Sequence, residues 1–468
     1  MRIALAAVLV LALDVELTGQ SAPTTGRSTT AAASSRPSGR RGRATAGTAD
    51  EREVRTRVFR QENPDVAAVV KLAAKAPRLP APTDLIIRVR TADELYEANR
   101  TCRRGTTILL EEGLYELPRT VVIRTDGVCL RGASGDREKV ILDRQGGSEG
   151  VMLAGADDVL VADLTIRNCA RMGVDVKGES DTQRTRIYNV KFHNIFVRAV
   201  KGTHPAGRST HPPDQGDNSN LPDAQFFRTR PTGGSIRYCL FVNDHRKTNP
   251  RDGFGGNYVG GIDMMGLKNW TISDNVFVGI RGRTGGGRGA IFVWVHSEDV
   301  TVERNIIVNC DNGICFGNPS GAALHMTRGV ARNNFIVAGV RRAFEIVRTR
   351  DTRVDHNTVY DPMGTSALAV HFFQGAEGDQ FRNNIVHGRA NLQKGVVSAS
   401  NFIGDCAGWF VDPAGGDLHL TPAARAAFGA ARPLADLTED FDRRRRKAAP
   451  DLGAAEYADD PADRRSGP

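Results

Sequence analysis

Residues 269–277 read Asn-Trp-Thr-Ile-Ser-Asp-Asn-Val-Phe, and residues 299–307 repeat this pattern as Asp-Val-Thr-Val-Glu-Arg-Asn-Ile-Ile. Later copies carry the same asparagine before a short apolar strand, and the successive asparagines lie 30, 29, 23 and 27 residues apart. These asparagines are Asn275, Asn305, Asn334, Asn357 and Asn384. A repeat of about 20 to 50 residues built from short apolar strands indicates a solenoid, in which each copy forms one coil.

The repeated asparagines are interpreted as structural rather than as ligands. Asparagine suits a tight corner because it tolerates left-handed backbone geometry and its side chain forms local hydrogen bonds. We expect each side-chain amide to bond to the next coil.

Length and charge are consistent with this fold class. The chain has 468 residues, which suits a fold that grows in one dimension. Lys and Arg number 63 against 54 acidic residues, which gives a net charge of +9 and favours an acidic partner. No base-stacking or groove-binding motif is present, so a nucleic acid is not expected as that partner. An acidic polysaccharide is the partner that we predict.

The first 84 residues precede the repeats. Residues 1–22 contain one Arg and then a short apolar run, which predicts a secretory signal and a secreted, periplasmic or cell-surface protein. Residues 23–84 are rich in Ser, Thr, Ala and Arg and predict a disordered linker, with a short helix within 51–80. The sequence contains no other apolar stretch suited to a membrane anchor.

The start of the folded region has a recognisable order. A strand near Val89 is followed by a helix that Thr91 can cap, with Glu94 three residues later, and then by strands over 105–117 and 121–136. This order resembles the first coils of secreted right-handed parallel β-helix proteins of the pectate-lyase-like superfamily. The resemblance implies a right-handed, single-stranded parallel β-helix over 85–415, whose open end is covered by the short N-terminal helix.

The C-terminal region also resembles such proteins. Residues 450–457 read Pro-Asp-Leu-Gly-Ala-Ala-Glu-Tyr, close to a terminal pattern of the superfamily, although Arg443 stands where that pattern has glycine. We expect residues 416–468 to form a terminal segment and tail, and the protein to be a monomer. The fold hosts lyases, hydrolases, epimerases and adhesins, so the resemblance leaves the activity open.

Each repeat carries a second strand, whose alternation predicts which side chains face the core. The predicted inward residues are Val174, Val176, Ile262, Met264, Ile291, Val293, Ile314, Phe316, Phe344, Ile346, Leu368 and Val370. The residues between them face outward and form a row of charged, imidazole and aromatic side chains, which we expect to line an open groove. They include Asp175, Lys177, Lys201, Asp263, Met265, Phe292, Trp294, His296, Glu345 and His371.

Trp294 and His371 are the predicted sugar-contacting members of this row, since an exposed indole can stack on a sugar ring. The alternative interpretation, which the sequence leaves open, is that a long loop covers the row and makes Trp294 part of a core. Three inserts, 203–233, 244–260 and 281–288, lie beside the row. In the third insert, Arg283 and Arg288 are predicted to hold carboxylates through forked hydrogen bonds.

The first functional hypothesis is a lyase that cleaves a uronate-containing glycan by β-elimination. That reaction needs a cation beside the uronate carboxylate, a base for the C5 proton and an acid for the leaving oxygen. Lys201 is the predicted base, with Lys177 as its substitute, and either needs a depressed pKa. The predicted acids are His204, His245 and His296. The predicted ligands for a Ca²⁺ ion beside the carboxylate are Asp175, Asp263 and Glu345.

Two other hypotheses stay open, because no local motif establishes a catalytic set. The same carboxylates could serve a glycoside hydrolase, which requires a pair about 5 to 9.5 Å apart. The same groove could also bind a glycan without turnover, as a carbohydrate-binding surface solenoid.

Overall fold

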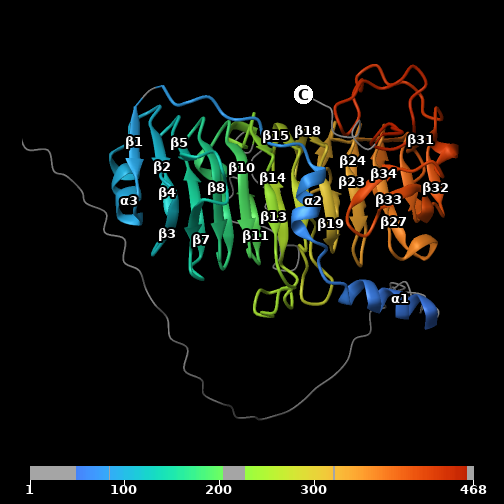
Figure 1. The fold of residues 1–468 in the computed structure, drawn as a ribbon, viewed down its shortest axis with the longest axis horizontal. Coiled ribbons are helices and arrows are strands. Elements are labelled where there is room, and N and C mark those ends of the chain that lie inside the picture. The colour runs from blue at the N-terminus through green and yellow to red at the C-terminus, as the bar shows by residue number, and fades with distance from the viewer. Residues whose placement is uncertain (1–48, 84, 204–226, 320–321, 461–468) are drawn as a thin grey trace, which may run out of the picture. The chain divides into compact units, whose positions relative to one another are not determined.

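A computed structural model of the protein describes residues 49–83, 85–203, 227–319 and 322–460. The chain divides into two units, 1–46 and 47–468, and the first unit lies outside the described residues, as does the predicted signal segment 1–22. Within the second unit, 32 strands pair in parallel as stacked coils, and β33 (Phe410–Asp412) and β34 (Asp417–Leu420) form a separate antiparallel pair (Figure 1).

Each coil contributes one strand to each of three faces. Face A comprises β1 (Ile86–Val89), β2 (Thr107–Leu110), β5 (Cys129–Gly132), β8 (Leu160–Arg167), β10 (Arg186–His193), β12 (Ser235–Arg237), β15 (Lys268–Ser273), β18 (Ser297–Glu303), β22 (Val330–Arg332), β25 (Arg353–Asp355), β28 (Gln380–Arg382) and β31 (Val397–Ala399). Face B comprises β3 (Gly113–Glu116), β6 (Val140–Asp143), the second halves of β8 and β10, β13 (Leu240–Val242), β16 (Val276–Val278), β19 (Ile306–Cys310), β23 (Phe335–Ala338), β26 (Thr358–Tyr360), β29 (Ile385–His387) and β32 (Phe402–Gly404). Face C comprises β4 (Val121–Ile123), β7 (Glu149–Ala154), β9 (Met172–Lys177), β11 (Arg198–Thr203), β14 (Gly260–Met265), β17 (Ile291–Trp294), β20 (Ile314–Phe316), β24 (Phe344–Arg350), β27 (Leu368–Glu377) and β30 (Arg389–Asn391). The short strand β21 (Met326–Thr327) pairs with β18 and β24.

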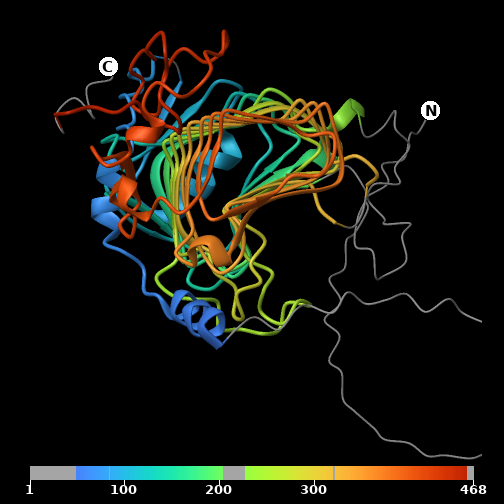
Figure 2. The ribbon, with the colours of Figure 1, turned by 90° about the vertical axis from the view of Figure 1, so that its right-hand side faces the viewer.

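The core runs along the inside of the coils, which superimpose in the view along the stack (Figure 2). Of the predicted inward residues on face C, all but one are fully buried. Leu368 is only half-buried, because a register shift between Leu368 and Val370 places Ala369 in the interior instead.

The repeated asparagines form a buried ladder, as predicted. Asn275 Nδ2 donates to Asn305 Oδ1 over 3.0 Å, and each following asparagine repeats this contact with the next coil. The backbone N–H of each asparagine also donates to the same oxygen. The left-handed residue of each corner is the one before the asparagine, such as Asp274 with φ 60°. The asparagines therefore serve the fold through their amides rather than through their backbone conformation.

The N-terminal cap is confirmed. Helix α3 (Ala92–Thr101) lies at the first coil, and the Thr91 side chain accepts a hydrogen bond from the Glu94 N–H. Leu95, Tyr96 and Ala98 of this helix are buried against the first strands, which closes the end of the core.

Face B is apolar on its outer side as well as its inner side, which explains the continuous apolar runs in its strands. Two segments cover it: helix α2 (Val66–Leu72) and the C-terminal residues 406–457. Residues 49–83 lie within the predicted linker 23–84, and they carry two helices, α1 (Ala49–Arg60) and α2, where one short helix was expected. The short 3-10 helices are η1 (Gly178–Ser180), η2 (Gly364–Ser366), η3 (Ala407–Trp409) and η4 (Arg425–Ala427).

Arg443 adopts the left-handed backbone that the superfamily pattern assigns to glycine, with φ 62°. A side chain in this conformation costs about 1 kcal/mol or more. The Arg443 guanidinium forms an ion pair with Asp274 and donates to the Tyr238 hydroxyl, which holds the C-terminal segment against the coils and offsets that cost.

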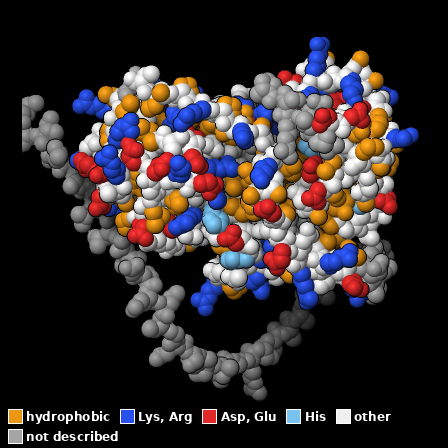
Figure 3. All heavy atoms as spheres, viewed as in Figure 1, with side chains coloured by type: hydrophobic (Ala, Val, Ile, Leu, Met, Phe, Trp, Pro, Cys, Tyr) orange, Lys and Arg blue, Asp and Glu red, His pale blue; other side chains and the backbone are white. Residues whose placement is uncertain are grey.

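Charges of both signs are interspersed on the face seen in Figure 3, so the net positive charge does not form one continuous patch on that side. In the part of the chain that the structure describes, every helix is too short or too polar to span a bilayer.

Candidate functional site

The strand register brings the predicted row together on the outer side of face C. Successive coils align Asp175 with Lys201, Lys201 with Asp263, and Glu345 with His371. In register order the row consists of Met152, Asp175, Lys201, Asp263, Phe292, Cys315, Glu345, His371 and Asn391. Neighbouring positions lie about 4.8 Å apart. Phe292 and Cys315 separate two groups of charged residues.

The first charged group centres on Asp263. Its Oδ1 accepts hydrogen bonds from Lys201 Nζ over 3.1 Å and from Trp294 Nε1 over 3.0 Å. Its Oδ2 accepts from Arg198 Nε over 2.5 Å, and the Arg198 guanidinium lies 3.9 Å from the centroid of the Tyr258 ring. Burial alone would raise the pKa of Asp263, but the charges of Lys201 and Arg198 lower it to about 2. Asp263 is therefore a stable anion at neutral pH.

Asp175 completes this group on the preceding coil. Only 1 % of Asp175 is exposed, and burial raises the pKa of its carboxyl. Its Oδ2 lies 2.7 Å from Lys177 Nζ, whereas its buried Oδ1 has no hydrogen-bond partner among the described residues. Burial alone would lower the pKa of Lys177, but the hydrogen bond and charge of Asp175 raise it. The depressed pKa predicted for Lys177 as a base is therefore wrong.

The second charged group centres on Glu345. Arg288 and Arg342 form ion pairs with it at 2.5 and 2.8 Å, and the Arg288 guanidinium lies over the Phe292 ring. Burial alone would raise the pKa of Glu345, but Arg288 lowers it. His371 stacks on Phe373, and burial followed by the charge of Arg342 lowers the pKa of its imidazole. Arg288 is thus bound to a carboxylate of the protein itself.

The row is buried, not an open groove as predicted. Lys201, Asp263 and Glu345 expose 5 % of their surface or less, because ion pairs neutralise them and aromatic rings pack beside them. Trp294 is 8 % exposed and packs in a cluster with Phe292 and Cys315. The prediction of a solvent-facing indole is therefore wrong, and the alternative of a buried Trp294 holds. Lys177, with 24 % of its side chain exposed, is the most accessible charged member of the first group.

The three predicted calcium ligands do not converge. Lys201 stands between Asp175 and Asp263, and Glu345 is three coils beyond Asp263, about 14 Å along the sheet. Each carboxylate forms an ion pair with a cation of its own. Among the described residues no group of three or more His, Cys, Asp or Glu side chains could hold a metal ion. These residues therefore do not fit a common Ca²⁺ site.

The predicted histidine acids are dispersed. His204 lies outside the described residues. His245 is exposed in the loop after β13, where its ring stacks on Phe196. His296 lies beyond the end of β17, because Val295 and His296 both take left-handed backbone angles and turn the chain out of the row. Neither described histidine is aligned with Lys201 in the strand register, and their catalytic roles stay predictions.

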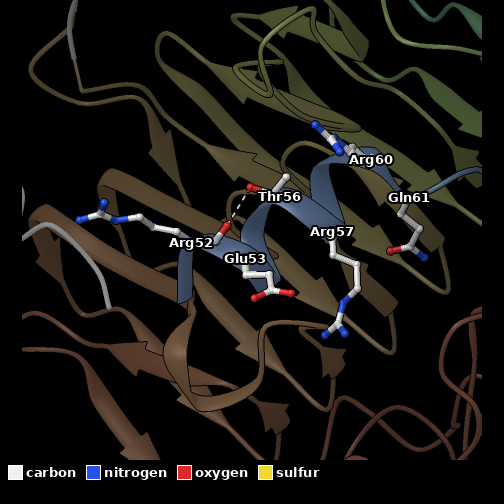
Figure 4. A pocket seen from close by; sticks show the side chains of 6 residues that line it. All are labelled: Arg52, Glu53, Thr56, Arg57, Arg60 and Gln61. Atoms are coloured by element: carbon white, nitrogen blue, oxygen red, sulfur yellow. Dashed lines mark hydrogen bonds between the residues drawn. The ribbon is translucent and has the colours of Figure 1, made fainter. Parts of the chain in front are cut away.

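Arg283 is exposed and donates from Nε to the Gly255 carbonyl over 2.9 Å. One hollow of the described surface lies beside the second charged group and is lined by Arg342 and Leu368. Another, of about 630 Å³, runs along α1, where the surrounding side chains diverge rather than converge on a common point (Figure 4). It therefore lacks the arrangement of a catalytic pocket.

Sequence reasoning missed Arg198 and Tyr258. Arg198 begins β11 three residues before Lys201, and its partner Asp263 lies beyond a long insert. Without the register between β11 and β14, nothing in the sequence connects these residues. Arg198 aligns with the uncharged Met172 and Gly260 on the neighbouring coils, so the strand positions gave no signal for it either.

No protein-family model matches the sequence, and no curated protein matches it. A search of solved structures finds the crystal structure of pectate lyase Pel9A at 13 % sequence identity and a TM-score of 0.59, covering 80 % of this chain and 97 % of that one. The protein is a right-handed parallel β-helix, the fold that it shares with this pectate lyase. A rhamnogalacturonan lyase matches at 10 % identity with a TM-score of 0.44, covering 79 % and 92 % of the two chains. At these identities the likeness is one of fold.

Proposed function

We propose that the protein cleaves a uronate-containing polysaccharide by β-elimination at the first charged group of face C. The observation that carries the proposal is the alignment of Asp175, Lys201 and Asp263 on three consecutive coils, with Arg198 and Lys177 beside them. Burying such charges costs several kcal/mol per ion before pairing, and Phe292 and Cys315 fill equivalent positions without charge. The fold does not require ions there, which favours a chemical role.

The residues match the demands of the reaction. Lys177, whose side chain is 24 % exposed, is the cation that could neutralise the uronate carboxylate, and Lys201 is the proposed base. Lys201 must first release a proton, and Asp175 is the better acceptor because its pKa is raised whereas that of Asp263 is about 2. The neutral amine then takes the C5 proton, the C4–O bond breaks, a C4–C5 double bond forms, and protonated Asp175 returns its proton to the leaving oxygen.

The test uses the full chain on polygalacturonate, alginate and a neutral glucan. We expect ultraviolet absorbance of an unsaturated product on an acidic glycan only, and loss of it in Lys201→Met. Lys191→Met is the matched control, because Lys191 forms an ion pair with Glu138 on the outer side of face B. Activity that survives in Lys201→Met, or an absence of unsaturated product from every acidic glycan, would refute the proposal.

Glycoside hydrolysis is the second candidate, on one specific observation. Asp175 and Asp263 are two coils apart, about 10 Å along the sheet, close to the carboxylate separation of inverting hydrolases. Their pKa values are shifted in opposite directions, as in an acid and base pair. New reducing ends without ultraviolet absorbance, lost in Asp175→Asn, would identify this reaction. Retention on an acidic glycan matrix with neither product would instead identify a binding protein.

Both reactions would take place where polysaccharides occur, outside the cytoplasm. The predicted signal segment 1–22 supports export.

A further inference from the structure

The loop between β13 and β14 presents an aromatic side chain to solvent. Phe254 is 63 % exposed, more than any other large apolar side chain among the described residues. The loop extends beyond the ends of the strands in Figure 1. Gly253 and Gly255 flank it with left-handed backbone, and a methyl group added at either position would meet no atom within 4 Å. Phe254 is therefore largely exposed to solvent in the loop that leads into β14 of face C.

The tip of this loop is fixed by a buried carboxylate. Asp252 Oδ1 accepts from the N–H groups of Phe254 and Gly256, both over 2.9 Å, and Oδ2 accepts from the Tyr258 N–H over 2.9 Å. Lys247 Nζ also donates to Oδ2 over 2.8 Å. Burial alone would raise the pKa of Asp252, but these donors lower it. The conformational entropy of the loop tip is thus lost when the protein folds, so a ligand does not have to order the tip when it binds.

The exposed ring is connected to the first charged group. Phe254 stacks on Tyr258 with a centroid separation of 5.1 Å and an interplanar angle of 17°. Tyr258 in turn lies against the Arg198 guanidinium, which pairs with Asp263. A ligand on Phe254 would therefore be linked to the proposed reaction centre through the Tyr258 ring and Arg198.

Arg283 supplies a cation next to this ring. The Arg283 side chain donates from Nε to the Gly255 carbonyl, and the Arg283 backbone N–H donates to the Gly256 carbonyl. These two bonds anchor Arg283 along the loop tip. The Arg283 side chain is exposed and forms no ion pair with a described carboxylate. An apolar ring face beside an anchored guanidinium is complementary to a sugar that has an apolar face and a carboxylate.

We propose that Phe254 and Arg283 form a subsite for one uronate residue of an acidic glycan, with the sugar ring on Phe254 and its carboxylate on Arg283. This inference rests on the proposed function for its glycan class, but it concerns binding and not turnover.

The test measures binding of hexagalacturonate, an oligomannuronate hexamer and neutral cellohexaose by titration calorimetry. All variants carry Lys201→Met so that no ligand is consumed. We expect Phe254→Ala to weaken binding of an acidic hexamer about tenfold, the effect of losing one stacking contact of about 1.4 kcal/mol. Phe254→Trp should preserve binding, and Arg283→Gln should weaken binding of the acidic hexamers. Leu114→Ala, which removes a 50 % exposed apolar side chain from β3, is the matched control.

Binding that changes less than twofold in Phe254→Ala overturns the inference, as does an equal loss in Leu114→Ala. Equal affinity for cellohexaose, or no binding of either acidic hexamer, also overturns it. Turnover is measured separately in the protein that retains Lys201. Binding that depends on Phe254, together with no turnover by that protein, would leave the subsite intact and refute only the reaction. Turnover by that protein, together with binding that does not depend on Phe254, would refute only the subsite.

Discussion

Lys201 Nζ donates to Asp263 Oδ1 over 3.1 Å across two neighbouring coils, and both side chains are nearly inaccessible to solvent. Because Asp263 also accepts from Arg198 and Trp294, one carboxylate organises three donors from two strands, β11 and β17, on the coils either side of it. The side chains that are proposed to take part in the reaction therefore also stabilise face C.

Removing the charge of Asp263 should destabilise the protein strongly. Asp263→Asn leaves Arg198 and Lys201 buried without their counter-ion, which we expect to cost about 3 to 5 kcal/mol of unfolding free energy. Lys201→Met should cost less, because Asp263 keeps Arg198 and Trp294. Denaturant unfolding measures both variants, and an equal loss in the two would contradict this ranking.

The asparagine ladder should contribute to stability at each rung. Asn334→Ala removes the acceptor of Asn305 Nδ2 and of the Asn305 N–H, both buried, so we expect a loss of about 3 kcal/mol. Asn391→Ala, at an exposed position at the end of the row, should change the unfolding free energy by less than about 0.5 kcal/mol. Similar values for the two would show that the ladder adds no stability.

A buried histidine should make the protein less stable in alkali. His419 lies between Asp417 at 2.6 Å and Asp442 at 3.0 Å; burial would lower its pKa, but the two carboxylates raise it to about 9. The folded pKa exceeds the unfolded value of about 6.5, so this stabilisation is complete below about pH 6.5 and is lost as the pH rises through 9.

The loss should be on the order of 3 kcal/mol, and melting temperatures between pH 6 and 10 would measure it. His419→Gln should lower stability at pH 6 and flatten the curve. His193→Gln, which removes a partly exposed ring beside Asp244, is the control for replacing a histidine. If the melting temperature of His419→Gln still falls with pH as in the unchanged protein, another group causes the loss of stability.

Asp361 should lower the stability of the protein, and it should do so at lower pH than the His419 effect. It is fully buried, its Oδ2 has no partner among the described residues, and burial raises its pKa to about 7. The folded state therefore retains a proton that the unfolded chain releases near pH 3.8, and stability falls as the pH rises from about 4 to 7.

Asp361→Asn should therefore stabilise the protein at pH 8, by at most about 4 kcal/mol, and have little effect at pH 4. The acceptor of the Met363 N–H is kept in this variant. Asp136→Asn is the control, since Asp136 accepts the equivalent N–H two residues later but is exposed. A gain of equal size at both pH values would indicate a cause other than titration.

Periodicity in the sequence was enough to predict the fold. The spacing of Asn275, Asn305 and Asn334 defined one coil per repeat, and alternation within the second strands predicted the inward residues with one error at Leu368. The same alternation placed Asp175, Lys201 and Asp263 on the outer side of one face. Predictions of this kind need only the two-residue alternation of side chains along a strand, and this alternation is visible in the sequence.

Only the tertiary structure decided which side chains of the row are exposed and which partners they bind. Whether Trp294 faces solvent or Asp263, and whether Arg288 is available or bound to Glu345, depends on contacts between coils separated by long inserts. The partnership of Arg198 with Asp263 spans 65 residues. The sequence by itself determined the coil, its core and the charged row, because these follow from short-range periodicity. Burial, ion pairing and the exposed Phe254 follow from how the coils and loops pack, which no local pattern encodes.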